Sequence, residues 1–120
     1  MNTPVSHDNL PELPILDRAA VLERLGGDED MLQTFLDLLL QQADTDLPKL
    51  TEAVQQGDAG RVEHLAHSLK GAAASLSAER VRQAAYQLES IGRSGDLTSA
   101  EDALAQLRIE VDQLRPFLKG

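Results

Sequence analysis

Apolar side chains recur at intervals of three and four along most of the chain, which is the period of a helix with one buried face. The longest series predicts a helix that starts after Asp28, with apolar positions at Leu32, Phe35, Leu36, Leu39, Ala43, Leu47, Leu50 and Val54. Pro48 lies inside this run and lacks a backbone N–H. The pattern therefore predicts either one kinked helix or two helices divided near Pro48.

Three more amphipathic helices are predicted after this one. Gly57 and Asp58 form a stop and a cap, and the next inner face consists of Val62, Leu65, Ala66, Leu69, Ala73 and Leu76. Ser77 is the predicted cap of the following helix, whose inner face is Val81, Ala84, Ala85, Leu88 and Ile91. A polar break is expected over 92–96, and residues 98–101 have the pattern of a reciprocal capping box. The last helix buries Leu104, Leu107, Val111 and Leu114 and ends near Pro116.

A short helix is predicted ahead of these four, with Asp17 as its cap and Gly26-Gly27 as its stop. No segment alternates strictly between apolar and polar residues as a half-buried strand does. Short connections favour antiparallel neighbours, so the expected fold is all-α, an antiparallel up-down-up-down four-helix bundle with a short extra N-terminal helix. The bundle domain is assigned to 16–118, and the proline-rich residues 1–15 are interpreted as a linker or flexible arm.

Composition narrows the classes of function. The 120 residues suffice for one domain, and the absence of cysteine excludes disulfides and thiolate chemistry. A net charge of −9 argues against nucleic acid as a partner. The chain shows neither a secretory signal nor a membrane-spanning run, so we expect a cytoplasmic domain without direct membrane contact.

Candidate chemistry gathers on the outer face of the helix that follows Asp58. His67 lies roughly 150° from the centre of the apolar stripe and should face solvent, with Lys70 on the flank beside it. Gly71 lies one turn further along, where a glycine costs about 1 kcal/mol relative to alanine and would let another molecule approach the imidazole. Ala74 extends this strip of small residues, and His64 also points outward.

Charge is distributed unevenly along the chain. Residues 61–93 carry a net charge of +2, so the remainder of the chain carries −11. Two interpretations of this uneven distribution are open. The charges can be distributed by chance over two solvated helix faces, or they can form a less negative surface that receives an anionic group beside a histidine.

The segment His67-Ser68-Leu69-Lys70-Gly71 resembles the signature of histidine-containing phosphotransfer (HPt) domains of bacterial two-component phosphorelays. The order of 25–28, the long helix, 57–58 and the Leu88-Glu89 pair is similar to the family's layout over roughly 16–118. Two positions depart from it. Many members have glycine where this chain has Ser77, and some have glycine or serine where it has Ala74.

The resemblance implies a phosphorelay intermediate. His67 would accept a phosphoryl group from the aspartate of a receiver domain and pass it to another receiver, while Lys70 would offset charge on that group. Gly71, Ala74, His64 and Glu89 would belong to the partner-binding surface, although Glu89 by itself resembles a solvated surface glutamate. No cofactor or metal is expected in this domain, because Mg²⁺ would be held by the receiver.

Several alternatives remain. The domain resembles the C-terminal module of a hybrid sensor histidine kinase, whose parent would be membrane-anchored, and a free-standing HPt protein is the alternative. A non-catalytic adaptor or dimerisation bundle would leave Gly71 unexplained. A metal site inside the bundle is disfavoured because this chain has no Glu-x-x-His pair. An autonomous kinase or hydrolase is disfavoured because the chain has neither a glycine-rich phosphate loop nor a Ser-His-Asp set.

Overall fold

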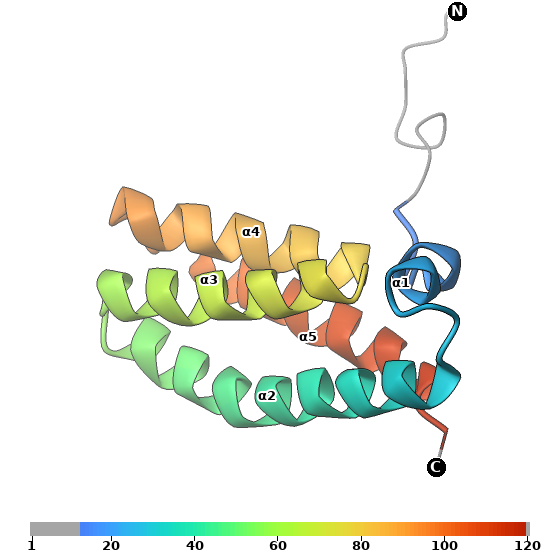
Figure 1. The fold of residues 1–120 in the computed structure, drawn as a ribbon. Coiled ribbons are helices and arrows are strands. Elements are labelled where there is room, and N and C mark those ends of the chain that lie inside the picture. Colours follow the sequence, from blue (N-terminus) through green and yellow to red (C-terminus); the bar gives the residue numbers. More distant parts are fainter. Residues whose placement is uncertain (1–12, 120) are drawn as a thin grey trace, which may run out of the picture.

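The computed structural model describes residues 13–119, and every regular element in that part of the chain is helical. The helices are α1 (Arg18–Arg24), α2 (Glu29–Gln55), α3 (Ala59–Ser75), α4 (Glu79–Ser94), α5 (Ala100–Leu114) and the short 3₁₀ helix η2 (Arg115–Phe117). Figure 1 shows α2 to α5 running alternately in opposite directions, with α1 across one end. The predicted all-α bundle is confirmed, whereas 1–12, most of the predicted linker, lie outside the described residues.

Three aspartates begin helices as predicted. The side chains of Asp17, Asp28 and Asp58 each accept a hydrogen bond, at 3.0–3.1 Å, from the backbone N–H three residues later. Such caps satisfy an otherwise unpaired donor and contribute roughly 1 kcal/mol each. The starts of α1, α2 and α3 are therefore fixed by local sequence.

Ser77 does not cap α4, contrary to the sequence prediction. Ala78 is the cap residue, and no side chain bonds to the first turn of α4. Ser77 adopts a left-handed φ of +54°, and its hydroxyl accepts a hydrogen bond from Arg24 at 2.9 Å. Its carbonyl accepts another from the N–H of Asp17. The side chain is thus turned back toward α1, which it helps to hold against the α3–α4 turn.

The break between α4 and α5 also differs from the prediction. Gly92 is a buried residue inside α4, which continues to Ser94 and ends at Gly95 with φ +80°. The capping box over 98–101 is not formed, because Asp96 accepts both the N–H and the hydroxyl of Thr98. Asp96 takes the backbone N–H that the Glu101 carboxylate would accept in the box, and it turns the Thr98 hydroxyl into a donor.

Pro48 lies inside one continuous helix, so α2 is not divided there. Figure 1 shows α2 curving along its length so that its C-terminal end rises toward α3. The core between the helices is made of leucine, valine and alanine, and its largest fully buried aliphatic residues include Leu32, Leu36, Leu50, Leu69, Leu88, Leu107 and Leu114. Phe35, expected on the buried face of α2, is exposed because the apolar arc of this helix is wider than its contact with the core. Across residues 13–119, no helix combines the length and the apolar composition of a bilayer span.

Candidate functional site

His67 stands on the outer face of α3, as its helical position predicted. Its side chain is 65% exposed, while Ala66 and Leu69 beside it on the helix are fully buried. The packing of α3 onto the core therefore presents the imidazole to solvent. Ring nitrogen Nδ1 is nevertheless engaged, at 2.7 Å from Oε2 of Glu89 on the neighbouring helix α4.

Glu89 is buried, which corrects the expectation of a solvated surface glutamate. Its side chain is only 2% exposed, and both carboxylate oxygens have cationic or N–H partners. Oε2 contacts His67 Nδ1 and a terminal guanidinium nitrogen of Arg93 at 2.9 Å, and Oε1 lies 2.7 Å from Lys70 Nζ. A carboxylate in this position is stable only when it is paired in this way.

The partners of Glu89 determine the proton arrangement at His67. The hydrogen bond from Lys70 holds the pKa of Glu89 below its ordinary value, with a further contribution from His67, against the opposing effect of burial. An ionised carboxylate only accepts hydrogen bonds, so Nδ1 of His67 carries the proton. The lone pair of the imidazole is then on Nε2, the nitrogen that does not contact Glu89.

Lys70 is drawn toward the same carboxylate. Besides its contact with Glu89, its Nζ lies 5.6 Å from the centre of the Tyr86 ring, at the outer limit of a cation–π contact. The sequence prediction placed this lysine beside His67 to stabilise a phosphoryl group. The structure places it within the network around Glu89, and its proposed role stays a prediction.

Arg93 and Glu63 complete the network and were missed by the sequence analysis. Nε of Arg93 donates to Oε2 of Glu63 at 3.0 Å, so the guanidinium bridges α3 and α4. Glu63 is one turn before His67, and Arg93 is one turn after Glu89. This i, i+4 spacing on two helices was visible in the sequence, but the facing of the helices was not. Gly92 makes it possible, because a Cβ there would lie 2.5 Å from the backbone nitrogen of Glu63.

The remaining predicted residues surround the imidazole on α3. Gly71 is exposed, and apart from the adjacent backbone of its own helix no atom lies within 4 Å of the place where a Cβ would be. Ala74 is exposed one turn further on. His64 is exposed on the other side and, with His67, Glu89 and Arg93, lines a shallow groove of about 350 Å³.

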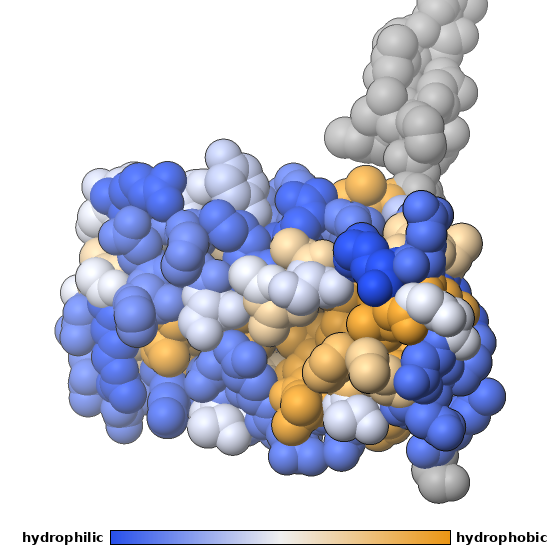
Figure 2. Space-filling view, in the orientation of Figure 1, coloured by the Kyte–Doolittle hydropathy of each residue, from blue (hydrophilic) through white to orange (hydrophobic). Residues whose placement is uncertain are grey.

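An apolar groove of about 280 Å³ lies between α2 and α3, near α1, and Figure 2 shows an orange hydrophobic surface over this part of the molecule. Its lining residues are Leu25, Phe35, Leu38, Leu39, Gln42, Ala72, Ser75 and Leu76. Gln42 bonds to Ser68, the neighbour of His67, at 3.0 Å. We call the groove formed by these eight lining residues the α2–α3 groove. It adjoins the face of α3 that carries Gly71 and Ala74.

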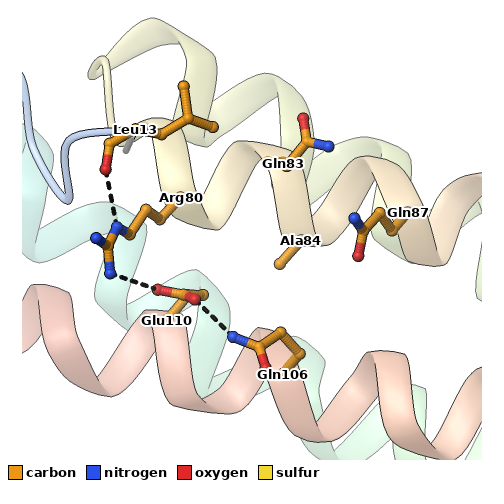
Figure 3. A pocket seen from close by; sticks show the side chains of 7 residues that line it. All are labelled: Leu13, Arg80, Gln83, Ala84, Gln87, Gln106 and Glu110. Atoms are coloured by element: carbon orange, nitrogen blue, oxygen red, sulfur yellow. Dashed lines mark hydrogen bonds and ion pairs between the residues drawn. The ribbon is translucent and has the colours of Figure 1, made fainter. Parts of the chain in front are cut away.

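A different groove, of about 480 Å³, separates α4 from α5 (Figure 3). Arg80 donates to the carbonyl of Leu13 at 2.8 Å, and Gln106 donates to Glu110 at 2.6 Å. None of its lining residues belongs to the network around His67. The first of these bonds ties the segment before α1 to α4, and the second lies within α5, so both have a structural role.

In the part of the chain that the structure describes, no three His, Asp or Glu side chains gather in an arrangement that could hold a metal ion. The expectation that this domain needs no cofactor stays a prediction.

Comparison with known proteins identifies the family of this chain. A family model described as Hpt domain matches residues 34–116. Among solved structures, histidine-containing phosphotransfer protein B (HptB) from Pseudomonas aeruginosa is similar, with a TM-score of 0.80 and 28% sequence identity over 89% of this chain and 93% of that chain. A search of curated proteins found no significant match.

Proposed function

We propose a specific role for this chain from the premise that it belongs to the Hpt domain family, whose members relay phosphoryl groups with receiver domains. In this role His67 is the phosphoacceptor. It takes the phosphoryl group from a phosphorylated aspartate of one receiver domain and gives it to the aspartate of another.

The observation that carries the proposal is the outward imidazole with Nδ1 bound to a buried, ionised carboxylate. Nε2 attacks the phosphorus of the aspartyl phosphate, and an Nε2–P bond forms as the bond from phosphorus to the aspartate oxygen breaks. The electron pair of the broken bond leaves with the aspartate oxygen. The ring then carries positive charge, because Nδ1 keeps its proton, and Glu89 stabilises that charge.

The onward step is the same reaction in reverse, toward a different receiver. Retention of the Nδ1 proton keeps the phosphorylated ring cationic, so the imidazole leaves as a neutral group. Lys70 offsets the negative charge of the phosphoryl group when its ammonium turns from Glu89 toward it. Mg²⁺ would be held by the carboxylates of the receiver.

The receiver docks on α3 over Gly71 and Ala74 and extends onto the α2–α3 groove. Gly71 leaves space beside the imidazole for loops of the partner, and Leu38 at 54% exposed offers apolar surface that an isolated domain leaves in water. His64 lies at the opposite edge of the contact. Such a surface is required because the aspartyl phosphate must be held in line with Nε2.

Between the two forms of parent protein, the free-standing alternative has the better support. The similarity covers 93% of the chain of HptB, which is described as a histidine-containing phosphotransfer protein. The C-terminal module of a hybrid kinase is therefore the second candidate. In either case the domain has no kinase activity of its own in this proposal.

The proposal is tested with a receiver domain carrying labelled phosphoaspartate. Incubation with the chain should transfer acid-labile label to it, and His67→Gln should abolish the transfer. His64→Gln is the matched control, since that histidine is also exposed on α3 but does not contact Glu89. Equal loss in the two variants, or no loss in His67→Gln, would contradict the assignment.

A further inference from the structure

Arg93 touches the same carboxylate oxygen as the imidazole does. Its terminal nitrogen donates to Oε2 of Glu89 at 2.9 Å, and His67 Nδ1 donates to that oxygen at 2.7 Å. Lys70 holds the other oxygen at 2.7 Å. Glu89 thus has one oxygen anchored by Lys70 and one shared between a permanent cation and the ring.

Sharing this oxygen has a definite electrostatic effect. Arginine is always protonated, so Arg93 keeps a positive charge beside a ring that becomes positive when Nε2 binds a proton or a phosphoryl group. It also withdraws part of the carboxylate's hydrogen-bonding capacity from Nδ1. Both effects reduce the stabilisation that Glu89 gives to the charged ring.

Glu63 limits this effect from the other side. Its carboxylate binds Nε of Arg93 at 3.0 Å and so divides the guanidinium between two anions. Arg93 is half-exposed, and its hydrogen bond to Glu63, followed by the charge of Glu89, raises its pKa above the ordinary value. The position of the guanidinium is therefore set by residues of both helices.

We propose that Arg93 is a positioning residue that acts through Glu89: by sharing Oε2 with the imidazole it restrains the stability of the phosphorylated ring, so that His67 can return the group to an aspartate. This rests on the proposed function of His67. A carrier held too firmly in its phosphorylated form would accept the group but pass it on slowly. The balance between accepting and returning the phosphoryl group therefore depends on Arg93, a residue outside the His67–Gly71 segment.

The charged and titratable groups around His67 come from two helices. On α3 they are Glu63, His64 and Lys70, and on α4 they are Glu89 and Arg93, with Tyr86 beside Lys70. From α2, Gln42 donates hydrogen bonds to Ser68 on α3 at 3.0 Å and to the buried carboxylate of Asp46 at 3.4 Å, so α2 reaches this face through the amide of Gln42. Of these groups, Arg93 is the cation that shares an oxygen with the ring.

The test has one readout without phosphate and one with it. In Arg93→Gln, the NMR titration midpoint of the His67 ring should move to higher pH by about half a unit to one unit, because the charged ring is better stabilised. In the presence of a receiver domain, the equilibrium ratio of phosphorylated His67 to phosphorylated receiver should rise by the corresponding factor of about three to ten. Glu63→Gln should shift both quantities in the opposite direction, since Arg93 then bonds to Glu89 alone.

Arg82→Gln is the matched control. It removes the same charge from the same helix, but Arg82 pairs with Glu79 instead of Glu89. A midpoint in Arg93→Gln that matches this control, or that moves to lower pH, overturns the inference. An unchanged phosphoryl ratio despite a raised midpoint also overturns it. If wild type accepts no label, the proposed function of His67 fails, whereas the titration still decides whether Arg93 acts on the ring.

Discussion

At the scale of single residues, the buried carboxylate of Glu89 organises the chemistry. An isolated carboxylate buried among apolar side chains would be strongly disfavoured, but three donors from α3 and α4 surround this one. Its lowered pKa means that the folded state holds it ionised more firmly than the unfolded chain does. The carboxylate therefore contributes to stability as well as to the tautomer of His67.

This contribution should depend on pH in a definite direction. Because the pKa of Glu89 lies below its ordinary value of 4.5, its stabilisation is complete above that value and is lost as the pH falls through the lowered pKa. Glu89→Gln should therefore lower the free energy of unfolding at pH 7 by about 1–2 kcal/mol, and the deficit should shrink in acid. Urea unfolding at several pH values measures it.

Glu23→Gln serves as the control for that experiment. Glu23 is exposed on α1, so its replacement should change stability by less than about 0.5 kcal/mol at any pH. A deficit in Glu89→Gln that stays constant or grows in acid would show that the carboxylate is not held ionised by its neighbours.

At the scale of elements, the pairing of α3 with α4 depends on two glycines with opposite roles. Gly92 faces α3, where a Cβ would lie 2.5 Å from the backbone nitrogen of Glu63 and 2.9 Å from the carbonyl oxygen of Ala59. Backbone atoms cannot move aside as a flexible side chain can. Gly71 faces solvent with open space beside it. One glycine serves helix packing, and the other serves an external partner in the proposed function.

Alanine at these two positions should therefore change stability with opposite signs. Gly92→Ala should destabilise the fold by about 1–3 kcal/mol, because it forces α4 away from α3. Gly71→Ala should stabilise it by about 0.5–1 kcal/mol, since a helix interior favours alanine and nothing obstructs the methyl group. The measurement is thermal or urea unfolding of each of the two variants, compared with the wild type. A stabilised Gly92→Ala, or a destabilised Gly71→Ala, would refute the packing argument.

At the scale of the whole molecule, the imidazole and the α2–α3 groove adjoin one another along α3. The groove is apolar, with Phe35 and Leu38 both exposed, whereas the α4–α5 groove is lined mostly by polar side chains. Apolar surface next to the proposed transfer site suits a partner that binds, reacts and dissociates. Figure 2 shows polar surface around it.

A charge placed in the α2–α3 groove should weaken receiver binding. Leu38→Glu should raise the dissociation constant about tenfold, equivalent to about 1.4 kcal/mol, because the carboxylate must lose its hydration in the complex. Isothermal titration calorimetry with a receiver domain measures this, and circular dichroism should show an unchanged fold. Ile109→Glu is matched to it, being 49% exposed on α5 away from the groove. Equal weakening by both variants would exclude the groove as the docking surface.

Much of the fold could be predicted from local pattern. The caps Asp17, Asp28 and Asp58 act within their own turns, so their effect is independent of the rest of the chain. Ser77 and residues 98–101 could not be predicted in this way. Ser77 bonds to Arg24, which is distant in sequence, and in the predicted box the N–H and the hydroxyl of Thr98 both bond to Asp96 instead.

The sequence alone determined that His67 faces outward, because the apolar stripe of one helix defines its opposite face whatever it packs against. It also determined the helices themselves and the open strip at Gly71. Tertiary structure alone decided that Glu89 is buried, that its oxygen binds Nδ1, and that Arg93 and Glu63 join it. The reason is physical: periodicity specifies how each helix divides its residues between inside and outside, but the register between α3 and α4 is set by their close contact at Gly92.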